Sequence, residues 1–221
     1  MGAAPSDRRD RPYDAVLFDL LTALLDSWSL WNAIAGDAES GRRWRGEYLR
    51  ITYQTGAYRA YEDLVAEAAE AVGLPRSLAA DLEARYSELQ PWPEACETLS
   101  SIAAAGVSLG IVTNCSERLG RMAADRLGVE FAVIVTAERA GFYKPHPQPY
   151  RLALAELKLD AQRCLFVAGS AYDLAGTSKV GLATYWHDRK GMTAPAGLPA
   201  PLAHDSSLEP LLPLVLNRGR L

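Results

Sequence analysis

The stretch Ala15-Val16-Leu17-Phe18-Asp19-Leu20-Leu21 places a single carboxylate, that of Asp19, directly after a short apolar run. Continuous apolar runs of this length, without alternating polar residues, are typical of strands buried in a parallel sheet. A polar residue at the carboxyl end of such a strand lies at the edge where open α/β sheets bind their ligands. A second acid two residues later would indicate a metal site, but Leu21 occupies that position.

The rest of the chain alternates apolar runs with helical segments. Besides residues 15–18, we expect strands over residues 107–112, 132–135, 164–167 and 183–186, and helices over residues 93–105, 117–127 and 149–157. The helix over residues 93–105 begins at a proline and stops before Gly106, which is the usual asymmetry of helix ends. Strands separated by helices at this spacing predict an α/β fold with a doubly wound parallel sheet.

Residues 28–90 interrupt this alternation. They contain no convincing strand, whereas residues 44–53, 61–72 and 75–89 have helical composition. Helices inserted after the first strand would form a cap over the carboxyl edge of the sheet, where ligands bind. We therefore divide the chain into a core domain (residues 13–27 and 91–221), a helical cap domain (residues 28–90) and a flexible tail (residues 1–12).

The composition is that of an ordinary globular protein and argues against several classes of partner. Of the 221 residues, 49% are hydrophobic and 23% are charged, and the formal net charge is −4. This charge gives no general attraction to nucleic acid or to an anionic membrane, and no apolar run is long enough to span a bilayer. The three cysteines form no CxxC pair. Their number and spacing favour reduced thiols in a cytoplasmic protein over a disulfide framework or a zinc site.

Four polar segments follow predicted strands and would meet at one edge of the sheet. They are Asp19, Thr113-Asn114, Lys144-Pro145 and Ser170-Ala171-Tyr172-Asp173. Taken alone, each has a plain structural explanation, because Asp19 could cap a turn, and Thr113 and Asn114 are residues that commonly begin helices.

The order and spacing of these four segments resemble the haloacid dehalogenase superfamily, over about residues 13–190. The resemblance implies a Rossmann-like core with an inserted helical cap. Most members are magnesium-dependent phosphatases, with Asp-x-Asp in the first motif and Gly-Asp-Ser-x-x-Asp in the fourth. In this chain Leu21 and Gly169 stand where those motifs carry acids. Since Mg²⁺ prefers carboxylate oxygens, the resemblance implies a site without metal and an enzyme without cofactor.

Further residues are similar to the metal-free branch of that superfamily, the 2-haloacid dehalogenases. Tyr150 follows Lys144 by six residues, Trp44-Arg45 matches an arginine of the dehalogenase cap, and residues 166–173 resemble Phe-Val-Ser-Ser-Asn-x-x-Asp. The resemblance therefore implies a hydrolase that acts on a small 2-haloacid. It leaves the oligomeric state open, with a homodimer as the form common among such enzymes.

The resemblance also implies a role for each candidate residue. Asp19 would attack the halogen-bearing carbon and form an ester, Lys144 would keep Asp19 ionised, and Asp173 would position or deprotonate the water that hydrolyses the ester. The other expected site residues are Arg45 and Asn114 for the halide, Thr113 and Ser170 with backbone amides for the substrate carboxylate, Tyr150 within the hydrogen-bond network, and the cap aromatics Trp31, Trp44, Tyr48 and Tyr53 as walls of the pocket.

Alternatives remain at the level of single residues and of function. The Gly-Thr that follows the dehalogenase nucleophile is Thr22-Ala23 here, so its hydroxyl is either supplied one residue early or lost. Ala168-Gly169-Ser170 lacks two polar groups of the fourth motif, and Arg45 could belong to a solvated helix face. A magnesium-dependent phosphatase for a small phosphate ester and a catalytically silent binding protein are the competing functions.

Overall fold

A computed structural model describes residues 11–216 of the chain. Residues 1–10, which make up most of the predicted flexible tail, lie outside the described residues. The guanidinium group of Arg163 donates hydrogen bonds to the carbonyl oxygens of Arg11 and Pro12, at 3.0 and 3.2 Å. These contacts attach Arg11 and Pro12 to the core just before the first strand, and the flexible tail stays a prediction.

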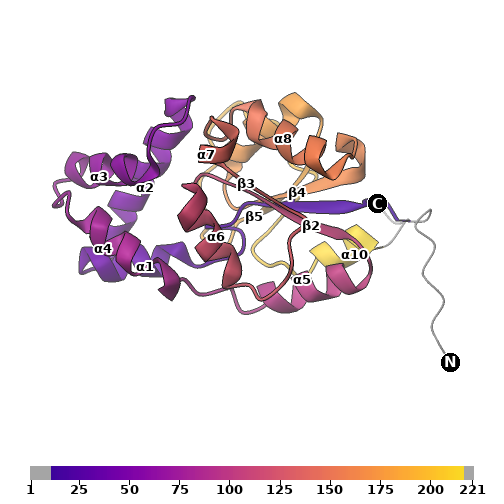
Figure 1. The fold of residues 1–221 in the computed structure, drawn as a ribbon, viewed down its shortest axis with the longest axis horizontal. Coiled ribbons are helices and arrows are strands. Elements are labelled where there is room, and N and C mark those ends of the chain that lie inside the picture. Colours follow the sequence, from indigo (N-terminus) through magenta and orange to yellow (C-terminus); the bar gives the residue numbers. More distant parts are fainter. Residues whose placement is uncertain (1–10, 217–221) are drawn as a thin grey trace.

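The predicted doubly wound parallel sheet is confirmed. Its six described strands are β1 (Ala15–Phe18), β2 (Ser108–Thr113), β3 (Val133–Thr136), β4 (Cys164–Ala168), β5 (Ala183–His187) and β6 (Ala203–Asp205), in the spatial order β3-β2-β1-β4-β5-β6 (Figure 1). All five pairings are parallel. Phe18 lies between Ile111 of β2 and Val167 of β4. Asp19, the next residue, therefore emerges at the carboxyl edge of the central strand.

Helices cover both faces of this sheet. They are α5 (Ala95–Ala104), α6 (Glu117–Asp125), α7 (Ala137–Ala140), α8 (Pro147–Leu157), α9 (Leu174–Thr177) and α10 (Leu211–Leu216). Alternate residues of β1 enter two separate apolar clusters: Val16 packs in the cluster that contains α5 and α10, and Leu17 packs in the cluster that contains α8. Figure 1 shows α8 on one side of the sheet and α5 with α10 on the other.

Between β1 and α5 the regular secondary structure is helical, as the composition predicts. These are α1 (Ser27–Ala35), α2 (Ala38–Thr55), α3 (Tyr61–Ala71), α4 (Leu78–Ala84) and the short 3₁₀ turn η2 (Tyr86–Glu88). They lie together at one end of the sheet (Figure 1). Helix α1 begins where the Asp26 carboxylate accepts a hydrogen bond from the Ser29 amide at 3.1 Å, so Asp26 caps the helix that follows the first motif. The division of the chain into a core domain and a cap domain stays a prediction.

Within residues 11–216, no helix combines the length and the apolar character needed to cross a membrane. The longest helix, α2, has a polar sequence, AESGRRWRGEYLRITYQT.

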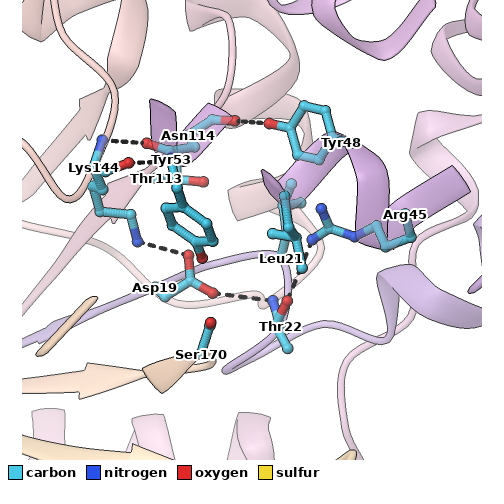
Figure 2. A pocket seen from close by; sticks show the side chains of 11 residues that line it. Asp19, Leu21, Thr22, Arg45, Tyr48, Tyr53, Thr113, Asn114, Lys144 and Ser170 are labelled. Carbon is cyan, nitrogen blue, oxygen red and sulfur yellow. Dashed lines mark hydrogen bonds and ion pairs between the residues drawn. The ribbon is translucent and has the colours of Figure 1, made fainter. Parts of the chain in front are cut away.

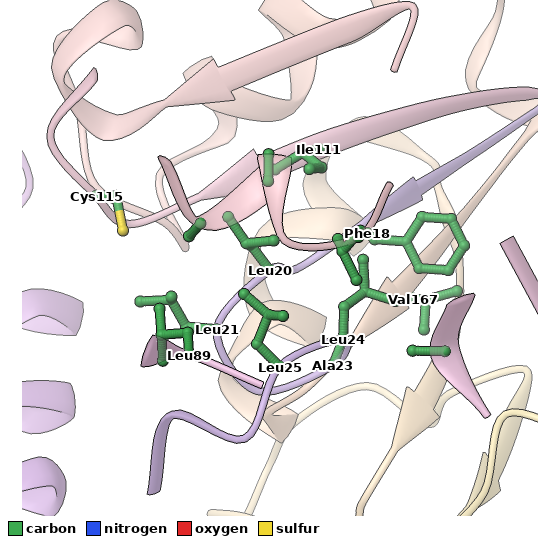
Figure 3. Packing of buried hydrophobic residues seen from close by; sticks show 14 of the residues in the cluster. Phe18, Leu20, Leu21, Ala23, Leu24, Leu25, Leu89, Ile111, Cys115 and Val167 are labelled. Carbon is green, nitrogen blue, oxygen red and sulfur yellow. The ribbon is translucent and has the colours of Figure 1, made fainter. Parts of the chain in front are cut away.

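The loop after Asp19 is anchored by apolar side chains. Leu20, Leu24 and Leu25 are fully buried, and Figure 3 shows them around the loop, close to Phe18 of β1. The amides of Leu24 and Leu25 both donate to the Leu20 carbonyl, at 3.2 and 3.1 Å. The residues after Asp19 are leucines because the side chains of this turn are buried in the core, directly behind the exposed end of the Asp19 carboxylate.

Replacing Leu24 by alanine should therefore destabilise the fold strongly. We expect Leu24→Ala to lower the free energy of unfolding by roughly 2–5 kcal/mol, the usual range for a truncated core leucine. The matched control is Leu202→Ala, because Leu202 is 41% exposed and its loss should change stability by less than about 0.5 kcal/mol. Urea unfolding followed by circular dichroism checks both values. Equal effects of the two substitutions would contradict the proposed anchoring.

Candidate active site

The backbone orients the Asp19 carboxylate. The Asp19 amide donates to the Val167 carbonyl at 2.9 Å, so Asp19 still belongs to the sheet's hydrogen-bond pattern although its side chain lies beyond it. Oδ2 of Asp19 accepts hydrogen bonds from the amides of Thr22 and Ala23, at 3.2 and 3.3 Å. One carboxylate oxygen is thus held by the turn that follows β1, which leaves Oδ1 for another partner.

That partner is Lys144. Its ammonium group lies 2.9 Å from Oδ1 of Asp19 (Figure 2). It also lies 3.1 Å from Oδ1 of Asp173, so one buried cation is shared between two carboxylates. Asn114 fixes the backbone of Lys144: its Oδ1 accepts from the Lys144 amide at 2.7 Å, and its Nδ2 donates to the Lys144 carbonyl at 3.1 Å. The Tyr48 hydroxyl in turn donates to the Asn114 carbonyl at 2.7 Å.

Burial and charge act in opposite directions on these three groups. Burial by itself would raise the pKa of Asp19, but the Lys144 charge and hydrogen bond, with smaller contributions from Arg45 and the Thr22 amide, lower it below its usual value. For Asp173, burial and the nearby Asp19 charge outweigh the attraction of Lys144, so its pKa is raised. Burial would lower the pKa of Lys144, but the two carboxylates raise it. Asp19 is therefore the carboxylate that stays ionised, and Asp173 the better proton acceptor.

Asp173 and Tyr150 lie deeper than the other predicted site residues. The Tyr150 hydroxyl donates to Oδ1 of Asp173 at 2.6 Å, and both side chains are buried. Neither residue lines the cavity in front of Asp19, whereas Lys144 does. Tyr150 is thus more than a packing residue, because its hydroxyl holds the carboxylate that shares Lys144 with Asp19.

Arg45 points into the protein and does not belong to a solvated face. It is 2% exposed, and its guanidinium carbon lies 5.2 Å from the ring centroids of Trp31 and Tyr48. Its Nη2 donates to the hydroxyls of Thr22 and Ser27, at 3.3 and 3.4 Å. Nε and Nη1 are buried, and no hydrogen-bond acceptor for them lies within residues 11–216. A buried cation with free donors is well suited to receive an anion.

A small cavity, partly open to solvent, lies in front of Asp19 (Figure 2). Its lining residues are Asp19, Leu21, Thr22, Arg45, Tyr48, Leu49, Tyr53, Thr113, Asn114, Lys144 and Ser170. The buried hydroxyl of Thr113 has no hydrogen-bond partner among the described residues, so it is available to a ligand.

Two of the four predicted cap aromatics do not line this cavity. Trp31 and Trp44 pack against each other, with ring centroids 4.4 Å apart, and the Trp44 indole donates to the Val65 carbonyl at 2.9 Å. Trp31 and Trp44 therefore form part of the interior of the helical layer and do not wall the pocket. Tyr48 and Tyr53 do line it.

The residues that differ from the dehalogenase pattern in the first and fourth motifs, Thr22-Ala23 and Gly169, are in contact with each other. A Cβ atom built on Gly169 would lie 2.4 Å from the Ala23 amide nitrogen and 2.6 Å from Cβ of Thr22. Gly169 is thus required for close approach of the two loops. The Thr22 hydroxyl lies at the cavity and accepts a hydrogen bond from Arg45, so a hydroxyl is supplied one residue early, although toward Arg45.

The donor set does not fit a magnesium ion. Among residues 11–216 there is no group of three or more acidic, histidine or cysteine side chains that could hold a metal. Both carboxylates at the site bind the Lys144 ammonium, and Leu21 presents an apolar side chain to the cavity. A hard divalent cation would find too few oxygen ligands here.

Three contacts were missed at the level of sequence. Thr22 and Ser27 hold the guanidinium of Arg45, and the Trp92 indole donates to the Thr22 carbonyl at 2.9 Å. Thr22 stands where the dehalogenase motif has a glycine, and this difference was a signal that the loop departs from the family pattern. Nothing in the sequence indicates the contact of Trp92 with a loop seventy residues earlier.

Comparison with known proteins gives one family and two kinds of relative. Residues 13–181 match the family model described as haloacid dehalogenase-like hydrolase. The (S)-2-haloacid dehalogenase 4A of Burkholderia cepacia is 29% identical over 91% of this chain and 94% of its own length. A phosphoglycolate phosphatase of Yersinia pestis is 33% identical, over 57% of this chain and 56% of its own. A crystal structure of a dehalogenase with an intermediate complex superposes with a TM-score of 0.80 at 25% identity, covering 94% of this chain and 99% of that one.

Removing the shared cation should be strongly destabilising in a pH-dependent way. We expect Lys144→Met to lower the free energy of unfolding by about 3–5 kcal/mol at neutral pH, because two buried carboxylates lose their partner. Without Lys144, burial raises the pKa of both acids above their unfolded values, so the variant gains relative stability as they become protonated. Its deficit should therefore shrink as the pH falls toward about 4.

Urea unfolding at neutral and at acidic pH measures this deficit. The control is Lys179→Met, since Lys179 is exposed and its loss should have a small effect at both values. A deficit for Lys144→Met that is the same at both pH values would contradict the charge-sharing arrangement.

Proposed function

The chain belongs to the haloacid dehalogenase-like hydrolases, and from this premise we propose that it is a metal-independent 2-haloacid dehalogenase. In this reaction Asp19 displaces halide from carbon and forms an ester that water then hydrolyses. The observation that carries the proposal is the Asp19–Lys144 contact of 2.9 Å, together with Leu21 where a metal ligand would stand. The relatives named dehalogenase, which match over nearly the whole chain, support the same class of substrate.

In the first step Oδ1 of Asp19 attacks the halogen-bearing carbon. A carbon–oxygen bond forms, the carbon–halogen bond breaks, and the halide leaves with the electron pair. Lys144 keeps Asp19 ionised before attack, which suits a nucleophile. Oδ2 remains on the Thr22 and Ala23 amides and becomes the carbonyl oxygen of the ester.

The departing halide is received by Arg45 and Asn114. Arg45 offers two buried nitrogen atoms without partners among the described residues, and Asn114 retains one N–H of its side-chain amide beyond the one that binds Lys144. Donors already in place where charge develops lower the barrier because they need no reorganisation. Three aromatic rings around Arg45 restrict its movement, which keeps these donors in one position.

The substrate carboxylate binds to the hydroxyls of Thr113 and Ser170. Both residues line the cavity, and Thr113 is the last residue of the neighbouring strand β2. The positive charges of Lys144 and Arg45 balance the negative charges of Asp19 and Asp173. The site is therefore close to neutral before an anionic substrate enters, which avoids strong repulsion of a monoanion.

Water completes the reaction with Asp173 as proton acceptor. The water oxygen attacks Cγ of Asp19, its proton passes to Asp173, and the negative charge gathers on Oδ2. The bond between Cγ and the substrate oxygen then breaks. The hydroxy acid takes up the proton left on the Asp19 carboxyl, and Asp173 later releases its proton to solvent. The raised pKa of Asp173 favours this proton transfer.

Phosphatase activity is the second candidate, favoured by the partial match to a phosphoglycolate phosphatase. It is less well supported, because the site lacks the oxygen ligands that a magnesium ion needs. A phosphate dianion beside Asp19 without metal would meet repulsion of about 4 kcal/mol per pair of unit charges at 4 Å, for an effective dielectric constant of 20.

The proposal includes a cytoplasmic enzyme that forms homodimers. The three cysteines are free, which suits a reducing compartment. Light scattering after gel filtration measures the oligomeric state directly.

The proposed activity requires halide release without metal. We expect the protein to release halide from chloroacetate or 2-chloropropionate in the presence of EDTA, since no step uses a metal. Asp19→Asn should lower this rate by at least about a thousandfold. Asp125→Asn, at the exposed end of α6, should leave it unchanged. Phosphate release that depends on Mg²⁺, without halide release, would overturn the proposal in favour of a phosphatase.

The ester predicts a specific fate for the oxygen of water. In a single turnover in ¹⁸O water, the label should enter the Asp19 carboxylate and be absent from the hydroxy acid, because water attacks Cγ of Asp19. Mass spectrometry of the peptide and of the product measures both. Label appearing directly in the product would exclude the covalent route.

Asp173 and Tyr150 should control how the hydrolysis rate depends on pH. Asp173 accepts a proton only when ionised, so the rate should fall as the pH drops through its raised pKa. The Tyr150 hydrogen bond lowers that pKa, so Tyr150→Phe should move the acidic limb of the kcat profile to higher pH. Tyr185→Phe is the control, because the Tyr185 hydroxyl binds the Ser207 carbonyl instead. If the acidic limb of the kcat profile stays at the same pH in Tyr150→Phe, Asp173 does not set the pH dependence of kcat.

A further inference from the structure

Three consecutive carbonyl groups in the loop after β1 accept hydrogen bonds from residues far along the chain. The Thr22 carbonyl accepts from Nε1 of Trp92, and the Leu24 carbonyl accepts from the Trp92 amide, both at 2.9 Å. The Ala23 carbonyl lies 2.8 Å from Nδ1 of His187. Neither Trp92 nor His187 lines the cavity, so both act on the site only through this loop.

The contact of Trp92 with Thr22 leads directly to the nucleophile. The Thr22 carbonyl and the Ala23 N–H belong to the same peptide unit, and that N–H donates to Oδ2 of Asp19. The indole N–H, this peptide and the carboxylate therefore form one chain of hydrogen bonds, whose members polarise one another. At 3.3 Å, the Ala23 bond is long for an N–H···O contact, so a small rotation of the peptide would weaken it further.

We propose that Trp92 is a positioning residue for ester hydrolysis: its indole N–H holds the peptide that stabilises the charge returning to Oδ2 of Asp19. The inference rests on the proposed function, in which Oδ2 is the ester carbonyl oxygen. During attack on carbon, Asp19 loses charge, so a weaker hydrogen bond to Oδ2 does not slow that step. During hydrolysis the charge returns to Oδ2, and the same hydrogen bond lowers the barrier.

The surroundings of Trp92 keep its indole in place. The side chain is 7% exposed, and the charged ends of Arg189 and Lys190 each lie 5.1 Å from its ring centroid. Arg189 is itself held by Glu94 at 2.7 Å. Such cations over an aromatic ring restrict its orientation. The indole N–H is thus directed at the Thr22 carbonyl by contacts that involve neither substrate nor cavity.

The test compares two Trp→Phe substitutions in the full chain. Trp92→Phe keeps an aromatic ring but removes the N–H. Trp186→Phe is the matched control, because Trp186 is 5% exposed and its indole N–H has no partner among residues 11–216. Ester formation and ester hydrolysis are measured separately with 2-chloropropionate, by rapid quenching and intact-protein mass spectrometry.

In Trp92→Phe we expect hydrolysis to slow about tenfold, while ester formation stays within about twofold of wild type. The ester should therefore accumulate, and kcat and KM should fall together. Trp186→Phe should match wild type in both steps. Hydrolysis at the wild-type rate in Trp92→Phe, or equal slowing of both steps, would overturn the inference. If wild type itself forms no ester, the proposed function fails, and the inference fails with it.

A second replacement keeps the test decisive should Trp92→Phe not fold. Replacing Trp92 by β-(3-benzothienyl)alanine preserves the bicyclic ring and exchanges the N–H for sulfur. The same selective loss of hydrolysis is expected, and unchanged hydrolysis would again overturn the inference.

Discussion

One lysine ammonium shared by two buried carboxylates is the interaction on which the site depends. Lys144 lies 2.9 Å from Asp19 and 3.1 Å from Asp173, and without it both acids would be buried without a counter-ion. Such a cluster is stable only if its members are held by further hydrogen bonds. Asn114 supplies two of these to the Lys144 backbone, and Tyr150 supplies one to Asp173. The segments that carry these residues leave different strands, so the parallel sheet is what brings the charges to one edge.

Sequence patterns predicted the sheet well because buried parallel strands are continuous apolar runs. Residues 15–18 coincide with β1, and the other predicted strands differ from the observed ones by one residue at one end or at both ends. The strand β6 (Ala203–Asp205) was missed, since it is three residues long and carries polar side chains on a half-exposed edge. Convergence of the four motifs followed from topology. The burial of Arg45 could not be predicted from the topology. Helix α2 contains several arginines, and which of them faces inward depends on how that helix packs.

The departures from the dehalogenase pattern form one local rearrangement. Gly169 leaves room for the Thr22–Ala23 backbone, where a Cβ atom would collide with it. The hydroxyl is carried by Thr22, one residue earlier than in the dehalogenase motif, and it accepts a hydrogen bond from the guanidinium of Arg45. It therefore orients a residue of α2. Neither change affects Asp19 or Lys144, which keep their contact. The altered loops are thus compatible with each other and with the charge arrangement, although each looks like a loss when the motifs are compared separately.

The helices α1–α4 are joined to the core at two points that lie next to the nucleophile. The chain enters them at Ser27, directly after the loop that holds Asp19, and it leaves them through residues 90–92, which return alongside residues 24–26. The Asp26 amide donates to the Gln90 carbonyl at 2.8 Å, and Leu25 forms an antiparallel bridge with Pro91. Both chain connections between these helices and the sheet therefore lie at the nucleophile loop. Hydrogen bonds from the returning segment to two carbonyls of that loop hold the two segments together. They allow the helices to supply Arg45 to the cavity without displacing the amides that hold Asp19.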